Sequence, residues 1–502
     1  MKAVLARLVV MGFLCLMVLS ISVGPAMAGR ASKEIQTDAP VYGDFSTNTS
    51  YGVPMLLRHS AAGEFKMLYF GENGSVNWGN AFYSNSSWSA LTSPAYTQNG
   101  ATWADQAVWG VAAVSNLIST DASGWTIQAI GDVNGDGVLE AICRSTATIA
   151  AYPTTKSQIR VMFFADNGTL RTAQPPPFYQ KTPWVIEGMG LFHTNNQVAM
   201  GVAANAEQLL LRHSTAGEFK LLQFQTNGSV AWGNAFLTNS SWTGLTDPAF
   251  TSIGSTWTNT DVWGVASVAG LISTNPARWT LDAIGDINGD GKKELIVRSI
   301  DTLPAAPTTK SQIRVLFFAD NGFSLKASQP PPFYQKTPWV IQGCGHFHDV
   351  DLTADGVATN ADQLLLRHST AGEYKLLYFQ TNGAVAWGSS FLTNSSWTGL
   401  SDPAFTSNGS TWTNTDLWGV AAVSTLISTN PADWVSQAIG DVNRDGRDEI
   451  ILRSTTTVAA APTTKSQIRV LFFADNGTKL KSDQPPPFYQ KTPWVIEGIN
   501  KK

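Results

Sequence analysis

One stretch of the chain carries oxygen-bearing side chains at alternate positions, which is the arrangement that proteins use to surround a hard cation. Asp132, Asn134, Asp136 and Glu140 can face one point if the chain turns tightly at the glycines between them. The backbone carbonyl of Val138 would complete a shell of about six or seven oxygen ligands, which suits Ca²⁺ better than Mg²⁺. The spacing therefore predicts a calcium site in this loop.

The same motif occurs three times. The other two copies comprise Asp286, Asn288, Asp290, Lys292 and Glu294, and Asp441, Asn443, Asp445, Arg447 and Glu449, where Lys292 and Arg447 contribute backbone carbonyls. Loops rich in Asp, Asn and Gly often serve only to turn the chain between strands. Because the complete spacing recurs each time, we favour calcium binding and expect about three sites, structural in role. An incomplete fourth pattern is a further candidate site, at Asp349, Asp351, Thr353 and Asp355.

The three motifs belong to three copies of a unit of about 155 residues. The tryptophans support this alignment, because all 18 fall into three equivalent sets. The unit boundaries lie at about 41–183, 184–338 and 339–493. A chain that repeats itself in this way folds as one repetitive architecture and not as three unrelated domains.

Each unit consists of two related halves, and both halves are patterned as β-meanders. Short runs of leucine, β-branched and aromatic residues are separated by Asn-Gly and Asp-Gly turns. Six such halves predict an all-β chain that forms a single β-propeller with about six four-stranded blades. The long segment in each first half, about Ser241 to Arg278 in the second unit, leaves seven or more blades as the alternative.

The two ends of the repeat region complement each other. Residues 494–500 repeat the sequence that opens a blade, Trp-Val-Ile-Glu-Gly, whereas the first blade, which begins near Tyr42, lacks it. We therefore expect 494–500 to act as a closing strand that pairs with the first blade. Such a closure would leave no open edge in the ring.

The first 28 residues are typical of a secretory signal peptide. Lys2 and Arg7 precede an apolar run, and Ala26-Met27-Ala28 matches a cleavage site. We expect 1–28 to be removed, 29–40 to form an N-terminal segment, and 41–502 to fold as the propeller in a secreted, periplasmic or extracellular protein. No later segment is apolar enough to span a membrane.

Charge and cysteine content narrow the classes of partner. Charged residues make up 14% of the chain, against about 25% in ordinary domains, and the net charge is -4. No basic stripe is present, so a nucleic acid partner is not expected. Cys143 and Cys344 lie where the other copies carry apolar residues, so we interpret both as small hydrophobic residues; a disulfide between them is the alternative.

The sequence from Gly131 to Glu140, followed by an apolar strand and repeated from Gly285 and Gly440, resembles the FG-GAP/VCBS repeat family. That family includes the propeller of integrin α-chains and repeats in many secreted bacterial proteins. The resemblance implies a propeller with Ca²⁺ bound in the loop that joins the first two strands of a blade. The first half of each unit resembles the family in its strands but has lost most of the loop carboxylates.

No arrangement typical of an active site is present. The chain contains no serine-hydrolase elbow, zinc-protease helix motif or phosphate loop, and its clustered carboxylates belong to the predicted calcium loops. We therefore predict a binding or adhesion module and not an enzyme. The alternatives are a protein-binding adhesin or scaffold and a polysaccharide lyase or hydrolase built on a propeller.

One tryptophan in each unit is a candidate for ligand binding. Trp88, Trp242 and Trp397 each follow Asn-Ser-Ser in a turn-rich segment. An aromatic ring beside amide and hydroxyl groups suits sugar recognition, so a glycan is the favoured partner and an extracellular protein the alternative. Packing of these rings between blades is the simpler explanation that a binding experiment must exclude.

Overall fold

The computed structural model divides the chain into two compact units, Met1–Val41 and Tyr42–Lys502. The first unit, with the predicted signal peptide and the segment 29–40, lies outside the described residues. The structure describes residues 54–60, 65–83, 96–98, 101–103, 124–151, 154–164, 171, 173–194, 201–214, 219–237, 250–252, 255–257, 278–304, 309–319, 325–326, 328–347, 349, 352–369, 374–392, 405–407, 410–412, 433–459, 464–473, 480–481, 483–492 and 494–498.

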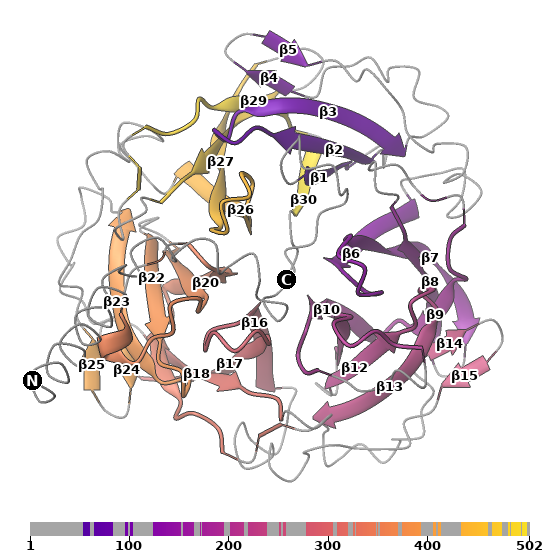
Figure 1. Cartoon of the computed structure of the whole chain (residues 1–502), viewed down its shortest axis with the longest axis horizontal. Helices are drawn as coiled ribbons and strands as arrows, with labels where there is room; N and C mark the ends of the chain where they lie inside the picture. Colours follow the sequence, from indigo (N-terminus) through magenta and orange to yellow (C-terminus); the bar gives the residue numbers. More distant parts are fainter. Residues whose placement is uncertain are drawn as a thin grey trace, which may run out of the picture. The chain divides into compact units, whose positions relative to one another are not determined.

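Six strands with closely related sequences form the innermost part of the second unit. Each begins with tryptophan and ends with glycine: β6 (Trp125–Gly131), β10 (Trp184–Gly190), β16 (Trp279–Gly285), β20 (Trp339–Gly345), β26 (Trp434–Gly440) and β30 (Trp494–Gly498). Neighbouring members of this set contact one another, β6 with β10, β10 with β16, β16 with β20, β20 with β26 and β26 with β30. Figure 1 shows them around a common centre, one for each blade.

Three further antiparallel strands extend outward from each innermost strand. They are β1 (Pro54–His59), β2 (Phe65–Phe70) and β3 (Val76–Tyr83); β7 (Glu140–Ala151), β8 (Thr154–Met162) and β9 (Phe178–Lys181); β11 (Gln208–His213), β12 (Phe219–Phe224) and β13 (Val230–Leu237); β17 (Glu294–Leu303), β18 (Lys310–Leu316) and β19 (Phe333–Lys336); β21 (Gln363–His368), β22 (Tyr374–Phe379) and β23 (Val385–Leu392); and β27 (Glu449–Val458), β28 (Lys465–Leu471) and β29 (Phe488–Lys491). The six sheets form a six-bladed β-propeller, as the sequence predicts.

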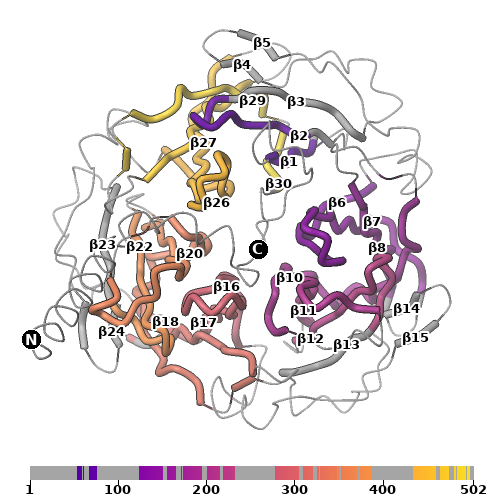
Figure 2. The backbone as a smooth tube through the Cα atoms, viewed as in Figure 1, coloured from indigo at the N-terminus to yellow at the C-terminus, as the bar shows by residue number. Residues whose placement is uncertain are grey.

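The ring closes through the predicted pairing of its ends. Strand β30 pairs antiparallel with β1, with Leu57 opposite Ile496 and His59 opposite Trp494. Arg58 of β1 also donates from Nε to Glu497 Oε1 at 2.8 Å. In Figure 2 the yellow tube of β30 lies beside the indigo tube of β1. The closing strand therefore completes a blade whose other three strands come from the first repeat unit, 41–183.

A second set of contacts links the repeat units and was not predicted. Short hairpins extend the outer edges of three blades: β14 (Phe250–Ser252) with β15 (Ser255–Trp257) joins β9, β24 (Phe405–Ser407) with β25 (Ser410–Trp412) joins β19, and β4 (Tyr96–Gln98) with β5 (Ala101–Trp103) joins β29. Each hairpin comes from the repeat unit that follows, around the ring, the unit whose blade it extends. The described part of the long segment thus extends an existing blade, so the alternative of seven or more blades is wrong.

The apolar cores lie between neighbouring blades. One cluster combines Ile142 and Phe178 of one blade with Trp184, Leu209 and Phe224 of the next. Since a blade packs against a neighbour on each face, both faces of its central strands are buried, and all six side chains of β12 are inaccessible. This explains why the central strands are nearly continuous apolar runs.

The described residues contain one complete 3-10 turn, η5 (Thr353–Asp355), and no helix long and apolar enough to cross a membrane. Cys143 is buried, Cys344 is partly buried, and neither forms a disulfide, in agreement with their interpretation as apolar positions.

Candidate calcium loops

The three predicted calcium loops occupy equivalent places in the ring. They connect β6 to β7, β16 to β17 and β26 to β27, the first two strands of alternate blades. In each loop the closing glutamate is the first residue of the second strand, so the sheet fixes its position. Asp132 and Glu140 are 2% and 0% exposed, which places these carboxyl groups inside the protein.

The first loop is organised by its own polar side chains. Asp132 accepts the backbone N–H groups of Gly135, Asp136 and Gly137 at 2.6, 3.1 and 2.9 Å. Asn134 Nδ2 lies 3.1 Å from Asp136 Oδ2 and 3.2 Å from Glu140 Oε1, so these three side chains converge. The φ angles of Gly135 and Gly137 are 74° and 83°, values that glycine adopts without strain.

The second loop repeats this geometry closely. Asn288 Nδ2 lies 3.2 Å from both Asp290 Oδ2 and Glu294 Oε1, and Asp286 accepts the N–H of Gly291 at 2.8 Å. Lys292, which would supply a carbonyl ligand, donates its own N–H to Asp290 at 2.9 Å. Val138 makes the same bond to Asp136 in the first loop.

The third loop differs at two positions. Arg444 replaces glycine and adopts a φ of 61°, the one left-handed non-glycine residue in the described part of the chain. Arg447 also turns its guanidinium onto the loop, with Nη2 2.7 Å from Asp445 Oδ2. In the first loop Arg171 makes the same contact with Asp136, also at 2.7 Å. Part of the acidic charge of these two loops is therefore already paired.

Burial and mutual repulsion raise the pKa values of the loop carboxyl groups. Desolvation, followed by repulsion from Asp132 and Asp136, raises the pKa of Glu140 to about 10. Desolvation and repulsion from Asp286 and Asp290 raise the pKa of Glu294 well above its ordinary value. Desolvation, followed by repulsion from Asp362 of the neighbouring blade, raises the pKa of Asp286 to about 7. Three ionised carboxylates at such a place are costly unless a cation compensates them.

The donor set fits a hard cation by its chemistry, because carboxylate, amide and carbonyl oxygens are the ligands that Ca²⁺ prefers. In the described part of the chain, no three His, Cys, Asp or Glu side chains already stand close enough together to hold a metal ion. Calcium binding thus remains a prediction, supported by the convergence of the side chains and by their buried negative charge.

The neighbouring blade holds each of the first two loops in place. Glu207, which precedes β11, accepts the N–H of Asp132 at 3.1 Å and donates its own N–H to the Asp132 carbonyl at 2.8 Å. Asn205 Nδ2 donates to the carbonyl of Gly135 at 3.0 Å. We call this two-way contact the inter-blade clamp. Asp362 and Asn360 repeat it on the second loop, as Glu207 and Asn205 do on the first.

The remaining candidate residues are only partly covered. Trp88, Trp242, Trp397 and Asp351 lie outside the described residues. Asp349 lies 2.7 Å from His346 Nε2, and Thr353 and Asp355 are exposed in the 3-10 turn η5. The fourth calcium site therefore stays a prediction. The inter-blade clamp itself escaped sequence reasoning, although the recurrence of Asn205-Ala-Glu207 as Asn360-Ala-Asp362 was a visible signal.

No protein-family model and no curated protein matches the sequence. Among solved structures, a crystal structure of a protein from Lactobacillus plantarum matches with 9% sequence identity and a TM-score of 0.32, over 86% of this chain and 83% of that one. So distant a similarity carries no argument about function.

Proposed function

We propose that this protein is a secreted calcium-binding β-propeller of the FG-GAP/VCBS type that acts as a binding or adhesion module. The observation that carries the proposal is the buried set of carboxyl groups in three equivalent loops, each with one of its acids at the start of a strand. Calcium concentrations outside the cell suit such loops. At a tenfold excess of calcium over its dissociation constant, each site adds about 1.4 kcal/mol to the free energy of unfolding.

Isothermal titration of the metal-free protein with calcium tests the first part of the proposal. We expect about three bound ions per chain. Asp290→Asn should remove one of them, because it takes a carboxylate from the second loop while keeping its shape. Glu72→Gln, which removes an exposed carboxylate outside all the candidate calcium loops, is the control and should leave the number of bound ions unchanged. Absence of binding at millimolar calcium would rule out the calcium proposal.

For the ligand we propose a glycan, recognised by the Asn-Ser-Ser-Trp segments that recur in the three units. Three equivalent sites on one ring would bind a multivalent glycan more tightly than a single sugar. A glycan array probed with and without chelator tests this, together with Trp242→Ala in a binding assay. Retention of one protein partner from an extracellular fraction, unaffected by free sugars, would favour an adhesin of the protein-binding kind instead.

A further inference from the structure

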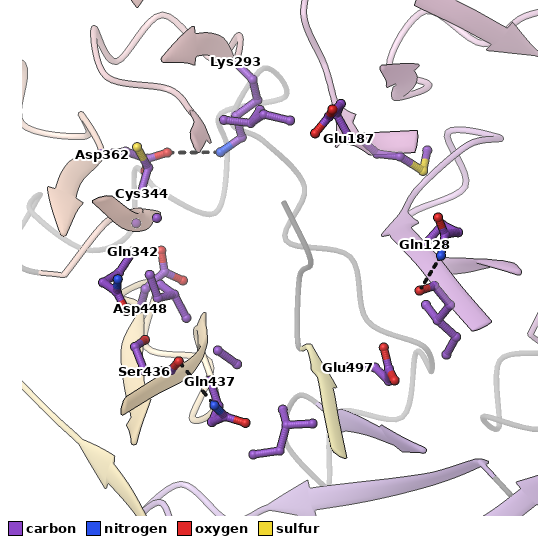
Figure 3. Close-up of a pocket in the computed structure, with 18 of the residues that line it drawn as sticks. Gln128, Glu187, Lys293, Gln342, Cys344, Asp362, Ser436, Gln437, Asp448 and Glu497 are labelled. Atoms are coloured by element: carbon purple, nitrogen blue, oxygen red, sulfur yellow. Dashed lines mark hydrogen bonds and ion pairs between the residues drawn. The ribbon is translucent and has the colours of Figure 1, made fainter. Parts of the chain in front are cut away.

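The centre of the ring contains a cavity of about 440 Å³. We call it the axial cavity; residues of β6, β10, β16, β20, β26 and β30 line it. Its volume falls within the range of about 300–1,000 Å³ that is usual for small-molecule sites. Figure 3 shows polar side chains of several blades around the same open space, among them Gln128, Glu187 and Glu497.

The backbone directs these polar side chains inward by a device that every blade shares. Each innermost strand has a β-bulge at the same position in its pairing with the next strand. The bulged residues are Gln128, Glu187, Asp282, Gln342, Gln437 and Glu497, and all except Asp282 line the axial cavity. Bulges that re-aim a side chain are frequent beside functional sites.

The lining of the axial cavity is strongly acidic. Five carboxylates face a single cation, Lys293, and these carboxylates belong to Glu187, Glu207, Asp362, Asp448 and Glu497. Three of the five form an ion pair with a cation. Glu497 contacts Arg58 at 2.8 Å, Glu187 lies 4.0 Å from Arg212, and Asp362 contacts Lys293 at 3.1 Å.

The other two carboxyl groups accept backbone hydrogen bonds and make no close ion pair within the described part of the chain, although the charge of Lys293 acts to lower the pKa of both against the larger raising effect of burial. Glu207 accepts the N–H of Asp132 at 3.1 Å, and Asp448 accepts the N–H of His346 at 2.7 Å. A carboxylate in an enclosed site normally pairs with a cation, because backbone dipoles alone offset only part of its desolvation.

Lys293 shows what kind of group fits beside such a carboxylate. It occupies the eighth position of the second loop, and its Nζ reaches Asp362, the clamp acid of the following blade, at 3.1 Å. The corresponding pair in the preceding repeat is Leu139 with Glu207. The chain therefore supplies an ammonium group for Asp362, whereas the residue aligned with Lys293 in the preceding repeat, Leu139, is apolar and buried.

We propose that the axial cavity binds a small organic cation, whose ammonium group lies beside Glu207 as the Lys293 ammonium lies beside Asp362. The methylene groups of such a ligand can pack on the isoleucines of the lining, such as Ile127 and Ile186. The lining contains further carboxyl groups, such as Asp448, for a second ammonium group, so we take a linear diamine as the ligand class. This ligand is separate from the calcium and the glycan proposed above.

Titration calorimetry with 1,5-diaminopentane, in saturating calcium and at low ionic strength, tests the proposal. 1,5-Pentanediol serves as the neutral control of equal length. We expect the diamine to bind and the diol not to bind. Glu207→Gln keeps an acceptor for the N–H of Asp132 but removes the charge, so it should weaken diamine binding about tenfold or more.

A second variant tests the internal comparison directly. Leu139→Lys should place an ammonium group beside Glu207 and so abolish diamine binding, whereas Leu139→Met should bind as the wild type does. Equal binding of diamine and diol, no binding of either, or unchanged diamine binding by both Glu207→Gln and Leu139→Lys would overturn the proposal. Calcium binding measured on the same samples shows separately whether the calcium loops are functional.

Discussion

Glu207 and Asp132 lie in consecutive blades and bind each other in both directions, through a 2.8 Å backbone hydrogen bond and a 3.1 Å bond from the Asp132 N–H to the Glu207 carboxylate. Asp362 and Asp286 do the same at 2.7 Å in each direction. In both pairs the residue that the clamp holds, Asp132 or Asp286, is the first residue of a predicted calcium loop. Loop geometry and blade packing are therefore linked.

The clamp can be tested through Glu207. Glu207→Ala leaves the buried N–H of Asp132 without its acceptor, which should lower the free energy of unfolding by about 1–3 kcal/mol. Glu207→Gln retains an acceptor and should cost much less. Urea unfolding of both variants in saturating calcium makes the comparison, and equal stabilities would show that the clamp contributes nothing.

One position of the candidate calcium loops allows a matched pair of substitutions. Gly289 has a φ of 75°, and a Cβ atom there would meet Asn360 Oδ1 at 2.6 Å, so Gly289→Ala should cost about 2 kcal/mol or more. Arg444 holds the corresponding position in the third loop at a φ of 61°. Arg444→Gly should leave the free energy of unfolding within about 1 kcal/mol of the wild type. Thermal unfolding in calcium checks both, and a harmless Gly289→Ala would refute the steric account.

The stability of the calcium-free protein should fall as pH rises. Burial raises the pKa of Asp441 to about 6, of Asp286 to about 7 and of Glu140 to about 10, all above their unfolded values. A raised carboxyl pKa means that the folded state holds the proton more tightly, so stability is greatest below the unfolded pKa and is lost as pH rises through the folded pKa.

Melting temperatures in EDTA should therefore decrease between about pH 5 and pH 8. Saturating calcium should reverse much of this loss, because the ion compensates the ionised carboxylates. The increase in melting temperature on adding calcium should therefore be larger at pH 8 than at pH 5. Two results would contradict this coupling between carboxyl ionisation and calcium binding. One is an equal calcium-induced increase in melting temperature at pH 5 and pH 8, and the other is a melting temperature in EDTA that rises with pH.

Closure of the ring can be tested by removing residues 494–502. Without β30, strand β1 loses its partner and exposes an unpaired edge, and apolar contacts of Trp494 and Ile496 are lost. We expect a lower melting temperature and aggregation during size-exclusion chromatography. A synthetic peptide of the deleted sequence should restore part of the stability, and a shuffled peptide should not. A truncated protein as stable as the full chain would argue against closure by β30.

Much of the fold follows from local sequence, because each blade repeats short apolar strands separated by turn residues. The pairing of β30 with β1 was also predictable, since the strand that opens a blade is missing from the first blade. The hairpins β4–β5, β14–β15 and β24–β25 were not predictable. Their strands have three residues each, and their partners lie in another repeat unit, so no local pattern determines the pairing.

The candidate calcium loops were identified from spacing alone, because their ligands lie close together in sequence. The inter-blade clamp and the axial cavity depend on contacts across the ring. Lys293 and Asp362 are 69 positions apart, and Glu207 and Asp132 are 75 positions apart. Their side chains meet only after the blades pack, so the recurring Asn-Ala-acid triplet marks a conserved feature of the repeat but does not reveal which residues it contacts.

The outer hairpins have a consequence for how the molecule can be divided. Every repeat unit places its hairpin on the blade of the preceding unit, and the first unit places β4–β5 on the last blade. One repeat unit, such as 184–338, therefore carries both a hairpin, β14–β15, and an edge strand, β19, that pairs with the hairpin of the next unit. Three separate copies of it could exchange hairpins in a circle, so this chain is equivalent to a symmetric trimer whose subunits have been joined end to end.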